Sequence, residues 1–179
     1  MRSLFVSATL FSVGVALAST AGQQVTKEDI PGITNFARVE TTVACGGAIK
    51  PEAVAELKQR GFKSIFDLQL SNERTANIEG EAAAAKDARI AFIHVPFSLT
   101  APDMASVEHF LAEIRKPENE PAFIHCGGGN RAAGFWLIKR VLVDNWDTDR
   151  ALKEAHALGL ADGQPMEVFA LDYIKSHKS

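Results

Sequence analysis

The sequence feature that most restricts the fold is the segment PAFIHCGGGNRAAG at residues 121–134. Its apolar run 122–124 has the composition of a buried strand, and a helix-forming run begins at Ala132. Three glycines between them allow a sharp turn from strand to helix. Such a turn directs successive backbone N–H groups into one concavity, which the helix N-terminus makes more positive. The segment therefore predicts an anion-binding loop within an α/β arrangement.

Cys126 follows His125 at the start of this loop, and Arg131 closes it. The loop amides and the Arg131 guanidinium favour the thiolate, which is the nucleophilic form of a cysteine. Arg131 can also hold a tetrahedral oxyanion through two parallel hydrogen bonds. The structural alternative is a turn formed for packing alone, with Cys126 as an inert buried side chain. We interpret the segment as a candidate active site in which His125 orients the loop.

Between residues 36 and 158 the chain carries, in order, a Gly46-Gly47 turn, GFKSIFDLQ, FIHVPF and the His-Cys loop. In these motifs it resembles the cysteine-dependent protein phosphatases. The resemblance is greatest to the bacterial dual-specificity-like branch, which includes the phosphatase-like domain of beta-lactamase-hydrolase-like proteins. It implies a protein tyrosine phosphatase-like fold with the loop at the carboxyl end of a central strand. It also implies Cys126 as the nucleophile and Arg131 as a phosphate binder, helped by the backbone N–H groups of Gly127, Gly128, Gly129 and Asn130.

Two departures from the family pattern keep the reaction type open. The phosphatase signature has five residues between its Cys and Arg, whereas four separate Cys126 from Arg131, and Ala132 stands where a Ser or Thr is usual. The shorter loop resembles that of the rhodanese sulfurtransferases. In a sulfurtransferase of this kind, Cys126 would carry a persulfide. A catalytically weak phosphate-binding or anion-binding module is the third interpretation. Hydrolysis of phosphomonoesters is the leading one.

The cysteine-dependent phosphatases, which this chain resembles, take their general acid from the region that corresponds to the segment before residue 104. Asp103 is the only carboxylate between Arg89 and Glu108, so it is the candidate proton donor. The same residues also predict a helix start, with Thr100 as the N-cap and Pro102 in the first turn. Helix capping explains Asp103 equally well.

Strands alternate with helices along the rest of the chain. We expect strands at 64–70 and 90–96 and helices at 79–89 and 165–175. The alternation predicts one α/β domain whose mainly parallel central sheet is flanked by helices.

Four polar residues of the predicted sheet and its loops have two interpretations each. Glu73 and Arg74 follow strand 64–70 at the carboxyl edge, where open sheets bind ligands, so they contact the substrate or are solvated. Asp67 is a buried functional carboxylate or faces polar surroundings, and we favour the second. His94 is interpreted as a satisfied core histidine rather than a catalyst.

The first 18 residues have the pattern of a secretory signal peptide. Arg2 precedes an apolar stretch, and Ala16-Leu17-Ala18 fits a small-x-small cleavage site. We expect a signal peptide at 1–18, a flexible lead-in at 19–35 and the phosphatase-like domain at 36–179. The mature protein is then exported and periplasmic, without stable membrane insertion. A retained membrane anchor is the alternative.

Export gives the two cysteines a further meaning, because an oxidising compartment permits disulfides. The resemblance implies that the strand of Cys45 runs parallel to that of Cys126. A regulatory Cys45–Cys126 bridge is therefore one hypothesis, and a buried unpaired Cys45 is the other.

Composition excludes several functional classes. A net charge of −3 gives no electrostatic basis for nucleic-acid binding. Two cysteines and five histidines show no metal-ligand spacing, so we expect neither a metal nor a cofactor. The expected partner is a phosphorylated substrate, either a protein or a small molecule.

Overall fold

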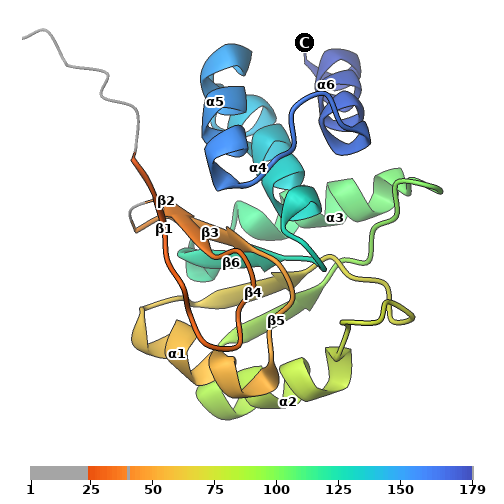
Figure 1. Ribbon diagram of the computed structural model, residues 1–179. Helices are drawn as coiled ribbons and strands as arrows, with labels where there is room; N and C mark the ends of the chain where they lie inside the picture. The colour runs from red at the N-terminus through yellow and green to blue at the C-terminus, as the bar shows by residue number, and fades with distance from the viewer. Residues whose placement is uncertain (1–23, 40, 179) are drawn as a thin grey trace, which may run out of the picture.

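The computed structural model describes residues 24–39 and 41–178, which form a six-stranded sheet with helices on both faces (Figure 1). The strand order is β1-β2-β3-β6-β4-β5. The four strands β3, β6, β4 and β5 are parallel, and β1 and β2 are antiparallel additions at one edge. The strands are β1 (Val25–Lys27), β2 (Ala37–Val39), β3 (Val43–Gly46), β4 (Ser64–Asp67), β5 (Ala91–His94) and β6 (Ala122–His125).

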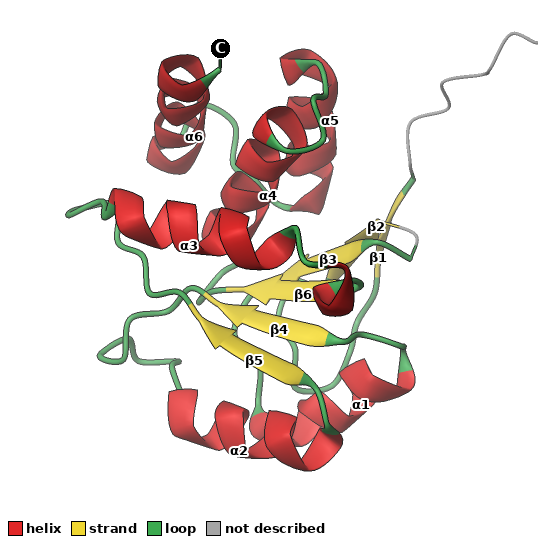
Figure 2. Cartoon of the chain, turned by 180° about the vertical axis from the view of Figure 1, so that it is seen from behind, coloured by secondary structure: helices red, strands yellow, loops and turns green. Residues whose placement is uncertain are grey.

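The helices form two layers, one on each face of the sheet (Figure 2). One layer contains α1 (Val54–Gln59), which continues from the 3-10 helix η1 (Pro51–Ala53), and α2 (Ile78–Ala88). The other contains α3 (Met104–Ile114), α4 (Asn130–Leu142), α5 (Thr148–Leu158) and α6 (Pro165–His177), and a short 3-10 helix η2 (Pro117–Asn119) precedes β6. The arrangement confirms the predicted α/β fold with its mainly parallel sheet.

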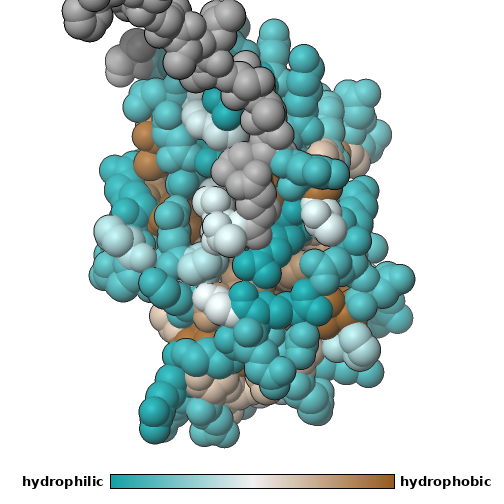
Figure 3. Space-filling model, turned by 90° about the vertical axis from the view of Figure 1, so that its left-hand side faces the viewer, coloured by the Kyte–Doolittle hydropathy of each residue, from teal (hydrophilic) through white to brown (hydrophobic). Residues whose placement is uncertain are grey.

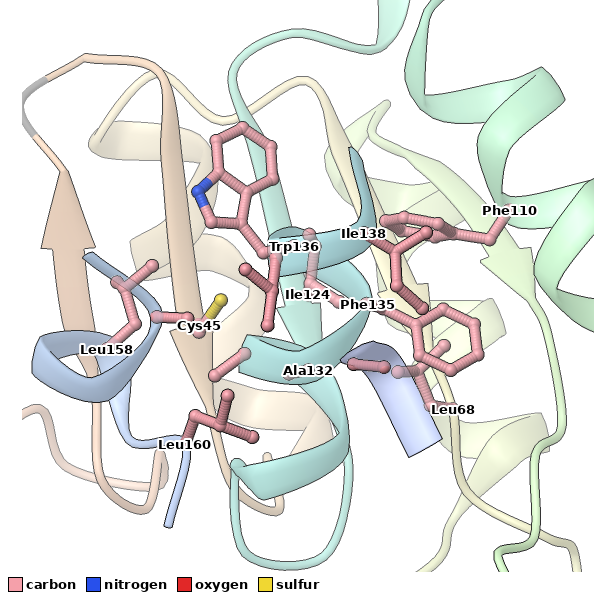
Figure 4. Close-up of a cluster of buried hydrophobic side chains, with 14 of the residues drawn as sticks. Cys45, Leu68, Phe110, Ile124, Ala132, Phe135, Trp136, Ile138, Leu158 and Leu160 are labelled. Atoms are coloured by element: carbon pink, nitrogen blue, oxygen red, sulfur yellow. The ribbon is translucent and has the colours of Figure 1, made fainter. Parts of the chain in front are cut away.

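Alternation along the central strands divides the core into two clusters. Phe66 and Ile124 face the α3–α6 layer, while Ile65 and Phe123 face α1 and α2. In the first cluster α4 is buried along nearly its whole length, and its Phe135 ring meets the Phe110 ring edge to face at a centroid separation of 5.1 Å (Figure 4). A helix that is buried on nearly all sides needs cover on each of them, which β3, β6, α3, α5 and α6 provide.

Residues 24–35 differ from the flexible lead-in expected there. β1 pairs with β2 and so forms one edge of the sheet. Ile30 and Ile33 are buried in the α1/α2 cluster. Three residues of strand and two isolated isoleucines are too short a pattern to detect from periodicity. The predicted signal peptide at 1–18 lies outside the described residues.

The start of α3 also differs from prediction. Asp103, not Thr100, is the N-cap, because its Oδ1 accepts the backbone N–H of Ala105 at 3.0 Å. Both residue types cap helices, and the sequence pattern did not distinguish between them.

The surface of the described part is largely polar, as the face in Figure 3 illustrates. Within residues 24–39 and 41–178, Met104 and Val168 are the large apolar side chains classed as exposed. No helix in this part of the chain is long and apolar enough to cross a membrane.

Candidate active site

The Cys126 loop, residues 126–131, connects the carboxyl end of β6 to α4. β6 lies between β3 and β4 in the middle of the parallel strands, so the loop emerges at the centre of the carboxyl edge. Gly129 caps α4 with a φ of 100°, a left-handed conformation that strains any residue with a Cβ. The glycine run therefore makes the tight strand-to-helix turn possible.

Neighbouring segments bind the loop from outside. The carbonyl oxygen of Gly127 accepts the N–H of Ala48 at 3.1 Å, and that of Gly128 accepts the side-chain amide of Asn35, also at 3.1 Å. The backbone of the 46–48 turn approaches so closely that a Cβ on Gly47 would lie 3.0 Å from the Gly127 oxygen. Because these carbonyl oxygens bind partners outside the loop, its backbone N–H groups can point to the inside.

The Cys126 sulfur lies inside the loop. Its Sγ accepts the backbone N–H of Gly129 at 3.1 Å, and the residue is 2% exposed. A hollow of about 370 Å³ borders the loop at Gly128 and Gly129. The Cys126 sulfur thus lies at the floor of the loop.

Arg131 is fixed by a bidentate ion pair with Glu73. Its Nη1 donates to Glu73 Oε1 at 2.7 Å and its Nη2 to Oε2 at 2.6 Å. Nη1 also donates to the carbonyl oxygens of Leu68 at 3.1 Å and Phe97 at 2.8 Å. Burial alone lowers the pKa of Arg131, but the Glu73 carboxylate and the Cys126 sulfur outweigh it and raise the pKa. The guanidinium is therefore a fixed positive charge beside the sulfur.

The donors of Arg131 suffice for an anion as well. A guanidinium has five N–H groups. The two on Nη1 are shared among Glu73 Oε1 and the two carbonyl oxygens, and one on Nη2 donates to Glu73 Oε2. One N–H on Nη2 and the one on Nε are left for the sulfur and an incoming oxyanion. Nη2 lies 3.9 Å from the point where a Cβ on Gly127 would sit, so it borders the loop.

The Glu73 carboxylate thus has a different partner from the one predicted. It does not face solvent from an open loop but binds Arg131 and accepts the backbone N–H of Leu70 at 2.8 Å. Burial raises its pKa, but the hydrogen bonds from Arg131 and Leu70 outweigh this and lower it overall. Arg74, the other predicted contact, is exposed.

The side chains of the remaining predicted site residues, Asp103 and Asn130, are engaged at helix starts. Asp103 caps α3, and its Oδ2 is 3.1 Å from the Ser106 hydroxyl that donates to it, so its carboxylate is engaged within its own helix start. Asn130 begins α4, and its side-chain oxygen accepts the N–H of Ala161 at 2.8 Å. A catalytic role for Asp103 stays a prediction.

Cys45 and Cys126 are both free in the structure. Cys45 is opposite Ile124 in the β3–β6 register, two residues before Cys126. One strand spacing and two residues of strand place the two Cα atoms roughly 8 Å apart, beyond the limit of about 7 Å for a disulfide without backbone movement. Burial, followed by the negative charges of Cys126 and Glu154, raises the pKa of the Cys45 thiol and makes it unreactive.

Three buried polar residues behind the loop were not grouped by the sequence analysis. Asp67, Glu81 and His125, here called the buried triad, meet on the α1/α2 side of the sheet, and all are 0% exposed. We interpreted Asp67 as facing polar surroundings and His125 as orienting the loop, but Glu81 drew no attention. It appears in sequence as one more acid in the first turn of a helix. The only sequence clue to a buried Glu81 is that the first turn of α2 has to pack against the sheet.

The family model described as DSP-PTPase phosphatase fused to NAD+ kinase matches residues 20–161. The chain belongs to this family. The finding agrees with the resemblance in the motifs. The loop nevertheless remains one residue shorter than the phosphatase signature that the sequence analysis used.

Two kinds of relative agree with the family. The dual specificity protein phosphatase TpbA of Pseudomonas aeruginosa strain UCBPP-PA14 is 25% identical over 134 residues, 74% of this chain and 58% of TpbA. The chain thus spans little more than half the length of that relative. Among solved structures, a DUF442 protein from Shewanella putrefaciens CN-32 matches with a TM-score of 0.66 at 17% identity, over 83% of this chain and 97% of that one. A cysteine-to-serine variant of P. aeruginosa TpbA in complex with phosphotyrosine matches with a TM-score of 0.63 at 20% identity, over 89% and 93%.

Proposed function

We propose that the protein is a cysteine-dependent phosphatase that hydrolyses phosphomonoesters. The observation that carries the proposal is the placement of the Cys126 sulfur, which accepts the Gly129 N–H next to an Arg131 that Glu73 holds in place. The thiolate attacks phosphorus and forms a P–S bond while the ester P–O bond breaks. Arg131 and the amides of residues 127–130 bind the three equatorial oxygens, and water then cleaves the phosphocysteine. Positioning and electrostatic stabilisation supply most of the rate.

The leaving oxygen needs a proton, and Asp103 is the proposed donor. In the structure this carboxyl accepts the Ala105 N–H and the Ser106 hydroxyl at the start of α3, so it has to leave the cap in order to donate a proton. Asn caps helices as well as Asp does, so Asp103→Asn keeps the fold while removing the acid. We expect kcat for an alkyl phosphate to fall about 10²- to 10⁴-fold, and much less for p-nitrophenyl phosphate, whose leaving group needs no proton. Equal losses on both substrates contradict this role.

The substrate class is a phosphorylated protein or small molecule. Support comes from the phosphotyrosine bound to the TpbA variant, which shares this fold. The 370 Å³ hollow next to the loop is lined by Gly128 and Gly129 but not by Cys126 or Arg131, so it is a candidate site for the rest of the substrate and not for the phosphoryl group. Lys27, Glu28 and Asp29 border that hollow. A mixed lining of this kind suits a polar leaving group.

A sulfurtransferase is the second candidate, and the short loop favours it. With four residues between Cys126 and Arg131, the enclosed space is smaller than in a five-residue signature loop. A persulfide on Cys126 needs less room than a phosphoryl group with three oxygens. In this alternative the Cys126 thiolate takes a sulfane sulfur from thiosulfate, releases sulfite and passes the sulfur to a thiol or cyanide.

One assay pair separates the functions. The purified chain without residues 1–18 is measured on p-nitrophenyl phosphate and, separately, on thiosulfate with cyanide, beside Cys126→Ser and the matched surface control Ser176→Ala. Phosphate release that is lost only in Cys126→Ser supports the proposal. Thiocyanate formation with the same dependence supports the sulfurtransferase, and phosphate binding without either turnover leaves the anion-binding module.

We further propose that the protein is exported to the periplasm. Support comes from the signal-peptide pattern of residues 1–18. Cell fractionation with a mass measurement of the mature N-terminus tests it. A full-length protein in the cytoplasm or the membrane fraction contradicts export with cleavage.

A further inference from the structure

The buried triad occupies a polar site between the sheet and α2. Asp67 ends β4 and His125 ends β6, where the two residues are partners in the strand register. Glu81 reaches them from the first turn of α2. One ligand atom from each residue lies within 4.8 Å of the other two, and all three residues are completely buried.

Most polar atoms of the triad lack the hydrogen-bond partners that buried polar groups require. Neither Glu81 oxygen has a hydrogen bond, nor does Asp67 Oδ2, nor either ring nitrogen of His125. His125 Nε2 is 3.1 Å from Glu81 Oε2, yet the two atoms do not meet in hydrogen-bond geometry. No lysine or arginine among residues 24–39 and 41–178 forms an ion pair with these carboxylates.

The charged groups around the triad do not remedy this. Asp67 Oδ1 accepts only the backbone N–H of Gln69, at 2.8 Å, and the imidazole of His94 is hydrogen-bonded to the Gln69 carbonyl oxygen at 2.9 Å. Burial raises the pKa of both carboxyl groups, and the His125 ring lowers it only in part. In the forms that bind a metal, two carboxylates and a neutral imidazole, the three side chains carry a charge of −2, which a dication cancels.

We propose that Asp67, Glu81 and His125 bind one divalent transition-metal ion, for which Zn²⁺ is the best match. His125 Nε2 is 3.1 Å from Glu81 Oε2 and 3.7 Å from Asp67 Oδ1. An ion about 2.1 Å from each atom subtends angles of about 95° and about 124° at these separations, within the range of four- to five-coordinate zinc. An imidazole with two carboxylates suits Zn²⁺, whereas Mg²⁺ and Ca²⁺ prefer oxygen ligands throughout.

The ion has a structural role rather than a catalytic one. The triad is on the α1/α2 side of the sheet, whereas Cys126 belongs to the core cluster on the α3–α6 side. The ion links the ends of β4 and β6 to α2 and fixes the side chain of His125, the residue before the proposed nucleophile. Zinc binding is therefore independent of the phosphatase activity, and it is tested without measuring turnover.

Metal content tests the site directly. The full chain without residues 1–18 is stripped with a chelator, loaded with Zn²⁺ and desalted, and zinc is counted by mass spectrometry. We expect one zinc per chain, a melting temperature that rises with the logarithm of Zn²⁺ concentration, and visible d–d absorption after Co²⁺ loading. Less than 0.1 zinc per chain with no thermal shift overturns the proposal.

Variants assign the ion to the triad. Glu81→Gln and Asp67→Asn should each lose the zinc and the Co²⁺ spectrum, while Glu79→Gln, an exposed glutamate on the same helix, should keep both. Circular dichroism shows whether the triad variants are folded. A second acidic group, His156 with Asp162 and Glu167, is more exposed and is the competing location. Zinc that persists in His156→Gln supports the triad; zinc lost there but kept in both folded triad variants overturns it.

Discussion

The ion pair between Arg131 and Glu73 allows a quantitative test of how the Cys126 loop is held. In Glu73→Gln the amide oxygen can accept one Arg131 N–H, but the amide nitrogen is a donor and opposes the other. The variant therefore loses one of two charge-assisted hydrogen bonds, of 2.7 and 2.6 Å, together with the negative charge. The Leu68 and Phe97 carbonyls still hold Nη1, so Arg131 is loosened rather than released.

The size of the effect follows from the bond that is lost. A hydrogen bond to a charged group contributes about 1.5–3 kcal/mol. The two side chains are 16% and 25% exposed, so water screens the pair in part, and we take the lower half, about 1.5–2 kcal/mol. If Arg131 positions the phosphoryl oxygens, kcat/KM falls about 10- to 30-fold, because 1.36 kcal/mol corresponds to a factor of ten.

The assay compares kcat/KM for an aryl phosphate at neutral pH in Glu73→Gln and in Glu79→Gln, a matched loss of an exposed carboxylate. Thermal unfolding of both variants is followed from pH 7 to pH 3. The pKa of Glu73 is lowered in the folded state, so its stabilisation is complete above the unfolded value of about 4.3 and is lost as pH falls further. The stability gap between wild type and Glu73→Gln should therefore close at low pH. A folded Glu73→Gln with unchanged kcat/KM refutes a positioning role.

Three further predictions concern the loop and its surroundings. Gly129→Ala, which puts a Cβ at a φ of 100°, should lower the free energy of unfolding by about 1–2 kcal/mol, whereas Gly128→Ala, whose Cβ meets nothing within 4 Å, should leave it unchanged; equal denaturant midpoints refute the strain. Native protein that has never been reduced should release two free thiols on denaturation, and a single oxidised pair of Cys45 and Cys126 in a peptide map contradicts the register. Without metal, Glu81→Gln should raise the melting temperature at pH 7 more than at pH 4, because a raised carboxyl pKa costs stability only above the unfolded value; an equal or opposite difference refutes it.

The Cys126 loop could be predicted because everything that specifies it is local. Strand, glycines, Arg131 and the helix start follow one another within 14 residues, so residue spacing alone brings Cys126 and Arg131 together. The partner of Arg131 was less accessible. Glu73 was located correctly at the carboxyl edge of the sheet, but only the fold shows that it pairs with the Arg131 guanidinium.

The buried triad was out of reach for a different reason. Its members are 14 and 44 residues apart, on a strand, a helix and another strand, so no ligand spacing exists to be read. Their meeting depends on the β4–β6 register and on the rotation of α2. The same holds for β1, whose three residues become a strand only because β2 offers an edge.

The alternation of side chains at the end of β6 explains how the buried triad and the Cys126 loop can use adjacent residues. Successive side chains of a strand point to opposite faces, so His125 enters the α1/α2 layer and Cys126 the other. Glycines let the surroundings close on the loop: a Cβ on Gly127 would lie 3.3 Å from Glu73 Oε2, and one on Gly46 would lie 2.9 Å from the Phe123 ring. Side chains at these positions would push Glu73 away from Arg131 or β3 away from β6. The short loop is thus held tight by its neighbours as much as by its length, and its preference for phosphate or sulfur depends on that packing.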